Sequence, residues 1–128
     1  MNRSLIFLFR LGLVVASLAI LYLATTPKDL RVLTHFYDKA NHLAAFACLA
    51  LLLDFSFPST PFGRWKIITL LAYGILIECL QSFVPSRHFS LLDFVADGVG
   101  ILVYCGVRPL LKALPVLRRR WQTTTGSI

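Results

Sequence analysis

Four long apolar runs, each about as long as a bilayer is thick, make up most of this 128-residue sequence. Only Arg10 interrupts the first run, and prolines or turn-forming residues stand between the runs. A helix rises about 1.5 Å per residue, so about 20 apolar residues match the hydrocarbon thickness of a membrane. We therefore predict an all-α membrane protein, folded as one domain over residues 1–128, with a bundle of four transmembrane helices at about 5–25, 39–57, 65–84 and 91–114.

The composition supports the bilayer as the solvent of this chain. Hydrophobic residues account for 57% and charged residues for only 15%, which is too little charge to cover a soluble surface of this size. The net charge of +7 does not indicate nucleic-acid binding, because the basic residues flank apolar runs. A cleaved signal peptide does not fit the first run, which is longer than the about 7–15 apolar residues of such peptides and lacks a small-x-small site.

Lysine and arginine are distributed unevenly between the two sides of the predicted bundle. With the N-terminus inside, the inner segments hold Arg3, Arg10, Arg64, Lys66, Arg108, Lys112, Arg118, Arg119 and Arg120. The outer segments hold Lys28, Arg31, Lys39 and Arg87. Because basic residues favour the cytoplasmic side, we predict a multi-pass protein of the cell (inner, cytoplasmic) membrane with both termini in the cytoplasm. Arg10 then reaches for the inner surface, and the Arg118–Arg120 run holds the C-terminus inside or attracts anionic lipid headgroups.

Ionisable residues inside the apolar runs gather toward the outer side. Glu78 and Asp97 each lie six residues inside the outer end of a predicted helix, about 9 Å deep. An ionised side chain at a helix centre in the membrane costs about 2.5–3.5 kcal/mol, so each acid needs a partner or a proton. Helical spacing brings further polar residues to the same level: Asp38, Asn41 and His42; Gln81; Asp93; and, in the connecting loop, Arg87 and His88. Their convergence predicts a functional site.

Several of these residues also have purely structural interpretations. Ser90 and Asp93 fit the capping box of the fourth helix, and Asp38 fits an N-cap of the second. Gln81 would equally join two helices, while Gly98 and Gly100 are typical of close helix packing. Glu78 and Asp97 would form a structural ion pair with Arg87 or Lys39.

A cation is expected between the two deepest acids. Two buried carboxylates close together cannot both ionise cheaply, so Glu78 and Asp97 should share a proton or a cation. The available cations are Arg87, Lys39 or a bound metal. We predict Arg87, because its planar fork binds two carboxylate oxygens at once.

These motifs, in this order, resemble those of the VanZ-like family of small membrane proteins. The resemblance spans about half of the chain and lies in Asp38-Lys39-x-x-His42-x-x-x-Phe46, Gly74-x-x-x-Glu78-x-x-Gln81 and Pro85-x-Arg87-x-Phe89-Ser90-x-x-Asp93-x-x-x-Asp97-x-x-Gly100. In the family pattern the place of Asp97 is usually Asn, so this sequence departs from it by an ionisable carboxyl where the pattern has a neutral amide. The family is named for an accessory protein of glycopeptide-resistance clusters, associated with teicoplanin resistance. The resemblance thus implies a link to antibiotic resistance.

Three functions fit this pattern. In the first, a membrane enzyme acts on a lipid-linked or cell-wall-related substrate of the envelope. Its candidate catalytic residues are His42, Glu78 and Asp93, and its candidate ligand-binding residues are Asp38, Lys39, Gln81, Arg87, Ser90 and Asp97. The second is a non-catalytic accessory protein that binds a lipid, a glycopeptide-like ligand or another membrane protein. The third, a small transporter, ranks last because four short helices leave little room for a path unless the chain forms a homo-oligomer.

The sequence identifies no cofactor. It assigns no metal ligands, although the acids and the histidine of an enzyme would also suit a divalent metal. The expected partners are membrane lipids, with no nucleic acid.

Overall fold

The computed structural model describes residues 1–26, 35–85 and 89–122, with only the backbone described for residues 35–38. Every element in these ranges is a helix, which confirms the all-α prediction. The helices are α1 (Arg3–Thr25), α2 (His35–Ser56), α3 (Arg64–Gln81), α4 (Leu91–Ala113) and α5 (Pro115–Gln122).

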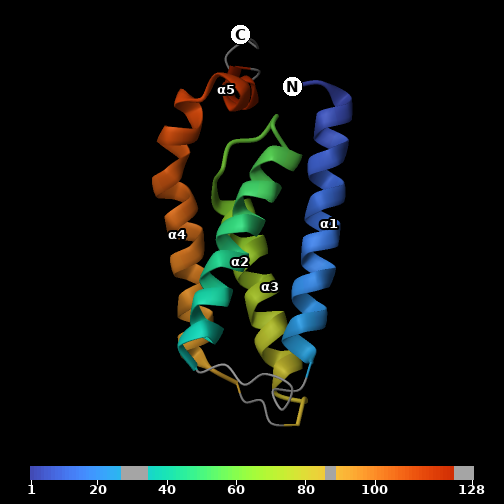
Figure 1. The fold of residues 1–128 in the computed structure, drawn as a ribbon, viewed down its shortest axis with the longest axis vertical. Coiled ribbons are helices and arrows are strands. Elements are labelled where there is room, and N and C mark those ends of the chain that lie inside the picture. The colour runs from blue at the N-terminus through green and yellow to red at the C-terminus, as the bar shows by residue number, and fades with distance from the viewer. Residues whose placement is uncertain (27–34, 86–88, 123–128) are drawn as a thin grey trace.

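The four long helices run up and down beside one another, and α5 lies at one end of them (Figure 1). The N-terminus, the α2–α3 connection and α5 share this end, which we call the terminal end. The start of α2, the end of α3 and the start of α4 lie at the opposite end, the far end. Helix α2 is central, because it packs against α1, α3 and α4.

Two of the helices, α1 and α4, are long and apolar enough to cross a membrane, judged by length and composition. Large apolar side chains are exposed along α1, α3 and α4, among them Leu18, Ile68 and Leu102. In contrast, α2 exposes no large apolar side chain over its described residues 39–56. Exposed apolar surface of this extent is typical of a face that meets lipid or another protein.

The centre of the bundle forms where α4 meets α2. On α2, Phe46, Leu49 and Leu53 recur at helical spacing and are buried. Gly100 of α4 lies against this face: a Cβ there would collide with the Leu43 backbone oxygen and crowd Phe46. Close packing is therefore observed at Gly100. It is not observed at Gly98, where a Cβ would meet nothing within 4 Å, so the prediction for that glycine is wrong.

Two helix ends lie more than two residues from the predicted ones, and one proline has a role that was not predicted. Helix α2 begins at His35, so Asp38 lies within the helix and does not cap it. Helix α3 ends at Gln81, with residues 82 and 83 in a turn. Pro115, expected only to end the fourth helix, opens α5, because a proline at the first helical position loses no intrahelical hydrogen bond.

Arg10 has a partner within the fold. Its Nε donates to the Ser56 carbonyl at 3.1 Å, and its guanidinium lies 5.1 Å from the centre of the Phe57 ring. Arg10 therefore ties α1 to the end of α2, in addition to any contact with the membrane surface.

Candidate functional site

Three helices bring four ionisable side chains together at the far end. His42 comes from α2, Glu78 from α3, and Asp93 and Asp97 from α4. His42, Glu78 and Asp97 each place a nitrogen or oxygen atom within 4.8 Å of the others. Asp93 Oδ2 lies 3.8 Å from His42 Nε2. We call these four residues the acid–histidine cluster.

Local sequence explains why these side chains meet. Asp93 and Asp97 are four residues apart, so they share one face of α4. Gly100 lets that part of α4 approach α2 closely. On α3, Gly74 lies one turn before Glu78 and leaves room for Asp97, because a Cβ at residue 74 would lie 2.9 Å from Asp97 Oδ2. Two glycines therefore provide the space in which the cluster forms.

His42 lies between two carboxylates. Its Nδ1 is 2.8 Å from Asp97 Oδ1, while its Nε2 faces Asp93. Lys39 Nζ lies 3.4 Å from Asp93 Oδ1, and the Lys39 side chain is 40% exposed. Three carboxylates thus face one lysine and one imidazole. If all three are ionised, the group remains negative even when His42 is protonated.

Glu78 takes part in the start of α4. The Ser90 hydroxyl accepts from the Asp93 backbone N–H at 3.3 Å, so the capping interpretation of Ser90 is correct. In a full capping box the Asp93 side chain would accept the Ser90 backbone N–H. Here Glu78 Oε2 accepts it instead, at 3.0 Å. The Asp93 carboxylate therefore does not cap the helix and instead lies beside Lys39 and His42.

Two carboxylate oxygens of the cluster have no hydrogen-bond partner within the described part of the chain. Glu78 and Asp97 are fully buried, and Glu78 Oε1 and Asp97 Oδ2 make no hydrogen bond to any described residue. A buried acceptor left unpaired typically costs about 1–3 kcal/mol, and more if it is charged. These oxygens therefore suit a proton, a cation or a polar ligand group.

The other predicted site residues are placed elsewhere or lie outside the described part. Gln81 donates from Nε2 to the Ala24 carbonyl at 3.2 Å, so it joins α3 to α1 and lies outside the cluster. The Asp38 side chain and Arg87 lie outside the described residues, so the pairing of Arg87 with Glu78 and Asp97 stays a prediction. The functional roles of all these residues also stay predictions.

A second ionic group, which the sequence patterns did not predict, lies at the terminal end around Asp54. This fully buried carboxylate accepts from Lys66 Nζ at 2.9 Å and Arg120 Nη2 at 2.6 Å. The Tyr104 hydroxyl donates to its other oxygen at 2.6 Å, and Arg108 Nε lies 3.5 Å from that oxygen. We call these five residues the Asp54 cluster; it joins α2, α3, α4 and α5.

Two cations of the Asp54 cluster, Lys66 and Arg120, are occupied by protein acceptors. Lys66 also donates to the carbonyls of Phe57 and Thr60, at 3.1 and 2.9 Å. Arg120 also donates to the carbonyls of Asp54, Pro58 and Thr60. An ammonium has three N–H donors, and all three of Lys66 are used. Arg108 Nε, in contrast, is buried and makes no hydrogen bond to a described residue. The contacts of Lys66 and Arg120 therefore fix α5 over the α2–α3 connection.

A signal for the Asp54 cluster was present in the sequence. Asp54 is the one acid on the predicted inner side, and Lys66 follows it across a short, proline-containing connection. The three arginines of the basic tail were all predicted to fix the topology or attract lipid. Only Arg120 is buried, whereas Arg118 and Arg119 are exposed.

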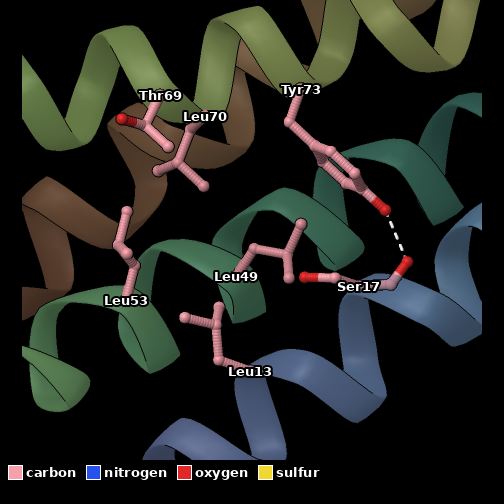
Figure 2. A pocket seen from close by; sticks show the side chains of 7 residues that line it. All are labelled: Leu13, Ser17, Leu49, Leu53, Thr69, Leu70 and Tyr73. Atoms are coloured by element: carbon pink, nitrogen blue, oxygen red, sulfur yellow. Dashed lines mark hydrogen bonds between the residues drawn. The ribbon is translucent and has the colours of Figure 1, made fainter.

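An apolar pocket lies between α1, α2 and α3 (Figure 2). Its lining residues are Leu13, Ser17, Leu49, Leu53, Thr69, Leu70 and Tyr73. The Tyr73 hydroxyl donates to the Ser17 carbonyl (Figure 2). No residue of the acid–histidine cluster lines this pocket, so it is separate from the candidate site.

Comparison of the chain with models of protein families, with curated proteins and with solved structures finds no match. The candidate site must therefore be interpreted from its own chemistry. Imidazole and carboxylate groups at these distances can exchange protons, bind a cation or hold a ligand through hydrogen bonds.

Proposed function

We propose that this chain is a VanZ-like protein that crosses the cell membrane four times with both termini in the cytoplasm. The supporting observations are the two apolar helices α1 and α4, and the placement of the N-terminus and α5 at one end (Figure 1). The acid–histidine cluster then faces the outer side, and the Asp54 cluster faces the cytoplasm. The excess of basic residues near the terminal end agrees with this orientation.

Three charged side chains within α2 and α3 are compatible with a membrane location. Asp54, Lys66 and Glu78 are fully buried against neighbouring helices and do not face the exterior of the bundle. Ionisable residues inside membranes usually point into the bundle and pair with one another. Helix α3 has 18 residues, which corresponds to about 27 Å of rise.

The acid–histidine cluster is proposed to bind or act on an envelope lipid or a cell-wall-related ligand at the outer leaflet. The observation that carries this proposal is the pair of buried, unpartnered oxygens of Glu78 and Asp97 beside His42. Lys39, partly exposed at the rim, would attract an anionic headgroup. His42, Glu78 and Asp93 would supply acid–base groups. A role in glycopeptide resistance would follow from the resemblance alone.

Native mass spectrometry of the full chain in detergent tests ligand binding. We expect an envelope lipid or lipid-linked molecule to co-purify with the parent and with the control Arg119→Gln, which changes an exposed charge at the other end. We expect Glu78→Gln to retain the fold, since glutamine can still accept the Ser90 N–H. The site variants to compare are Glu78→Gln and Lys39→Ala. If both retain the same lipids as the parent in the same amounts, the acid–histidine cluster has no part in lipid binding.

A non-catalytic accessory role is the second candidate. The contact between Glu78 Oε2 and the Ser90 backbone favours it, because this contact gives Glu78 a structural purpose without chemistry. Glu78→Gln separates the two candidates. If the Glu78→Gln variant loses activity but still binds its ligand, the result favours an enzyme. If the function of this variant is unchanged, the result favours the accessory role.

A further inference from the structure

We infer that His42, Glu78 and Asp97 form a binding site for one divalent transition-metal ion. The three residues come from three different helices, and each contributes one potential ligand atom within 4.8 Å of the other two. Protein nitrogen and carboxylate oxygen atoms bind Zn²⁺ at about 2.0–2.2 Å, so two ligands of one ion lie at most about 4.4 Å apart. In tetrahedral geometry the ligand atoms would lie about 3.5 Å apart, so the side chains would have to close around an ion by up to about 1.3 Å.

The unpaired oxygens are an independent indication of a missing ligand. Glu78 Oε1 and Asp97 Oδ2 are buried and have no hydrogen-bond partner among the described residues. Both residues are fully buried, so bulk water does not satisfy these acceptors. A metal ion would use the acceptors that the protein leaves free, while Glu78 Oε2 keeps its contact with the Ser90 N–H.

The charges of the site also fit a dication. Glu78, Asp93 and Asp97 bring three negative charges when ionised, and Lys39 brings one positive charge to Asp93. With a neutral His42, an ion of charge +2 together with Lys39 balances the three carboxylates. Among the described residues no arginine forms an ion pair with the cluster, and its cationic partners are Lys39 and, when protonated, His42.

The types of ligand atom limit which metal ions the site would bind. An imidazole nitrogen with two carboxylates suits Zn²⁺ or Mn²⁺ better than Mg²⁺ or Ca²⁺, which prefer oxygen ligands alone. Asp93, beside His42 Nε2, would orient the ring in the way that carboxylates commonly support a metal-binding histidine. Three protein ligands leave coordination positions open, as in catalytic sites. The inference deepens the proposed function, since a phosphate oxygen of a lipid would fill such a position, but metal binding itself does not depend on that function.

Isothermal titration of the full chain in detergent tests the inference. The protein carries an affinity tag without histidine, is stripped with EDTA, and is titrated with Zn²⁺ and with Mn²⁺ in the absence of added lipid. We expect one ion per chain, bound at least about tenfold more weakly by His42→Gln, Glu78→Gln or Asp97→Asn. The control, with Cys48, Cys79 and Cys105 all changed to serine, should bind like the parent, because these free thiols lie outside the site.

X-ray absorption spectroscopy of the zinc-loaded parent tests the ligands without any variant. We expect only nitrogen and oxygen neighbours at about 2.0–2.2 Å, including one imidazole. No metal binding by the parent, sulfur ligands, or site variants that bind like the parent would overturn the inference. If the metal binds but no lipid co-purifies, only the proposed function fails. If lipid binds the stripped protein and no metal does, only the metal site fails.

Discussion

At the scale of single residues, the two oxygens of Glu78 have different surroundings. Oε2 accepts the Ser90 backbone N–H and so supports the first turn of α4. Oε1 is buried without a hydrogen-bond partner among the described residues. One side chain therefore combines a structural contact with an unused acceptor, and substitutions can separate the two.

We expect Glu78→Ala to destabilise the protein by about 1–3 kcal/mol, because the Ser90 N–H loses its acceptor at a half-buried helix start. Glu78→Gln should cost clearly less, since its amide oxygen accepts the same bond. Thermal unfolding in detergent measures both. Equal stability of the alanine variant and the parent would show that the contact with Ser90 contributes nothing.

At the scale of elements, the approach of α4 to α2 depends on one glycine. A side chain at Gly100 would meet the α2 backbone, whereas one at Gly98 would meet nothing within 4 Å. The two positions lie on the same helix two residues apart, so they form a matched pair for testing helix packing.

We expect Gly100→Ala to destabilise the bundle by about 1–3 kcal/mol, the usual cost of overpacking, because α4 must move away from α2. The same shift should separate Asp97 from His42. Gly98→Ala should be neutral or stabilising by up to about 1 kcal/mol, because alanine favours a helix over glycine. Unfolding curves of the two variants measure this difference in stability. If both substitutions change the stability equally, the observed contact between α4 and α2 at Gly100 is contradicted.

The Asp54 cluster joins four elements through one carboxylate. We expect Asp54→Asn to destabilise the protein by about 3–5 kcal/mol, because Lys66 and Arg120 stay buried without their counter-charge. Limited proteolysis should then cut near α5. The exposed Arg119→Ala is the control and should unfold like the parent. Partial rescue by Lys66→Met would show that unbalanced charge is the cause, and an unaffected Asp54→Asn would contradict the role of the cluster.

At the scale of the whole molecule, the bundle has its N-terminus and α5 at one end (Figure 1). We expect a reporter fused to the C-terminus to be cytoplasmic and one inserted at Ser86 to be extracytoplasmic, because basic residues concentrate at the terminal end. Enzyme reporters active on only one side of the membrane measure this. An extracytoplasmic C-terminus would contradict the proposed topology.

The sequence predicted the long helices because apolar runs and prolines mark their extent, and α1 and α4 match within about two residues. It also indicated that Glu78 and Asp97 would lie close together, since both are six residues inside the ends of neighbouring helices that a short loop joins. It did not predict that His42 pairs with Asp97, nor that Arg120 reaches Asp54 across 66 residues. Such long-range pairs depend on how the helices dock, which local patterns do not encode.

The Asp54 cluster also decides how a molecule would reach the acid–histidine cluster. His42 and Asp54 are 12 residues apart on α2, about 18 Å along the helix axis. At the terminal end, Lys66 and Arg120 already donate to buried acceptors of the protein. A molecule entering there would have to break several buried hydrogen bonds at once. In the proposed membrane orientation, we therefore expect a ligand to reach the acid–histidine cluster through the far end or from the lipid, and we expect no continuous passage along the bundle.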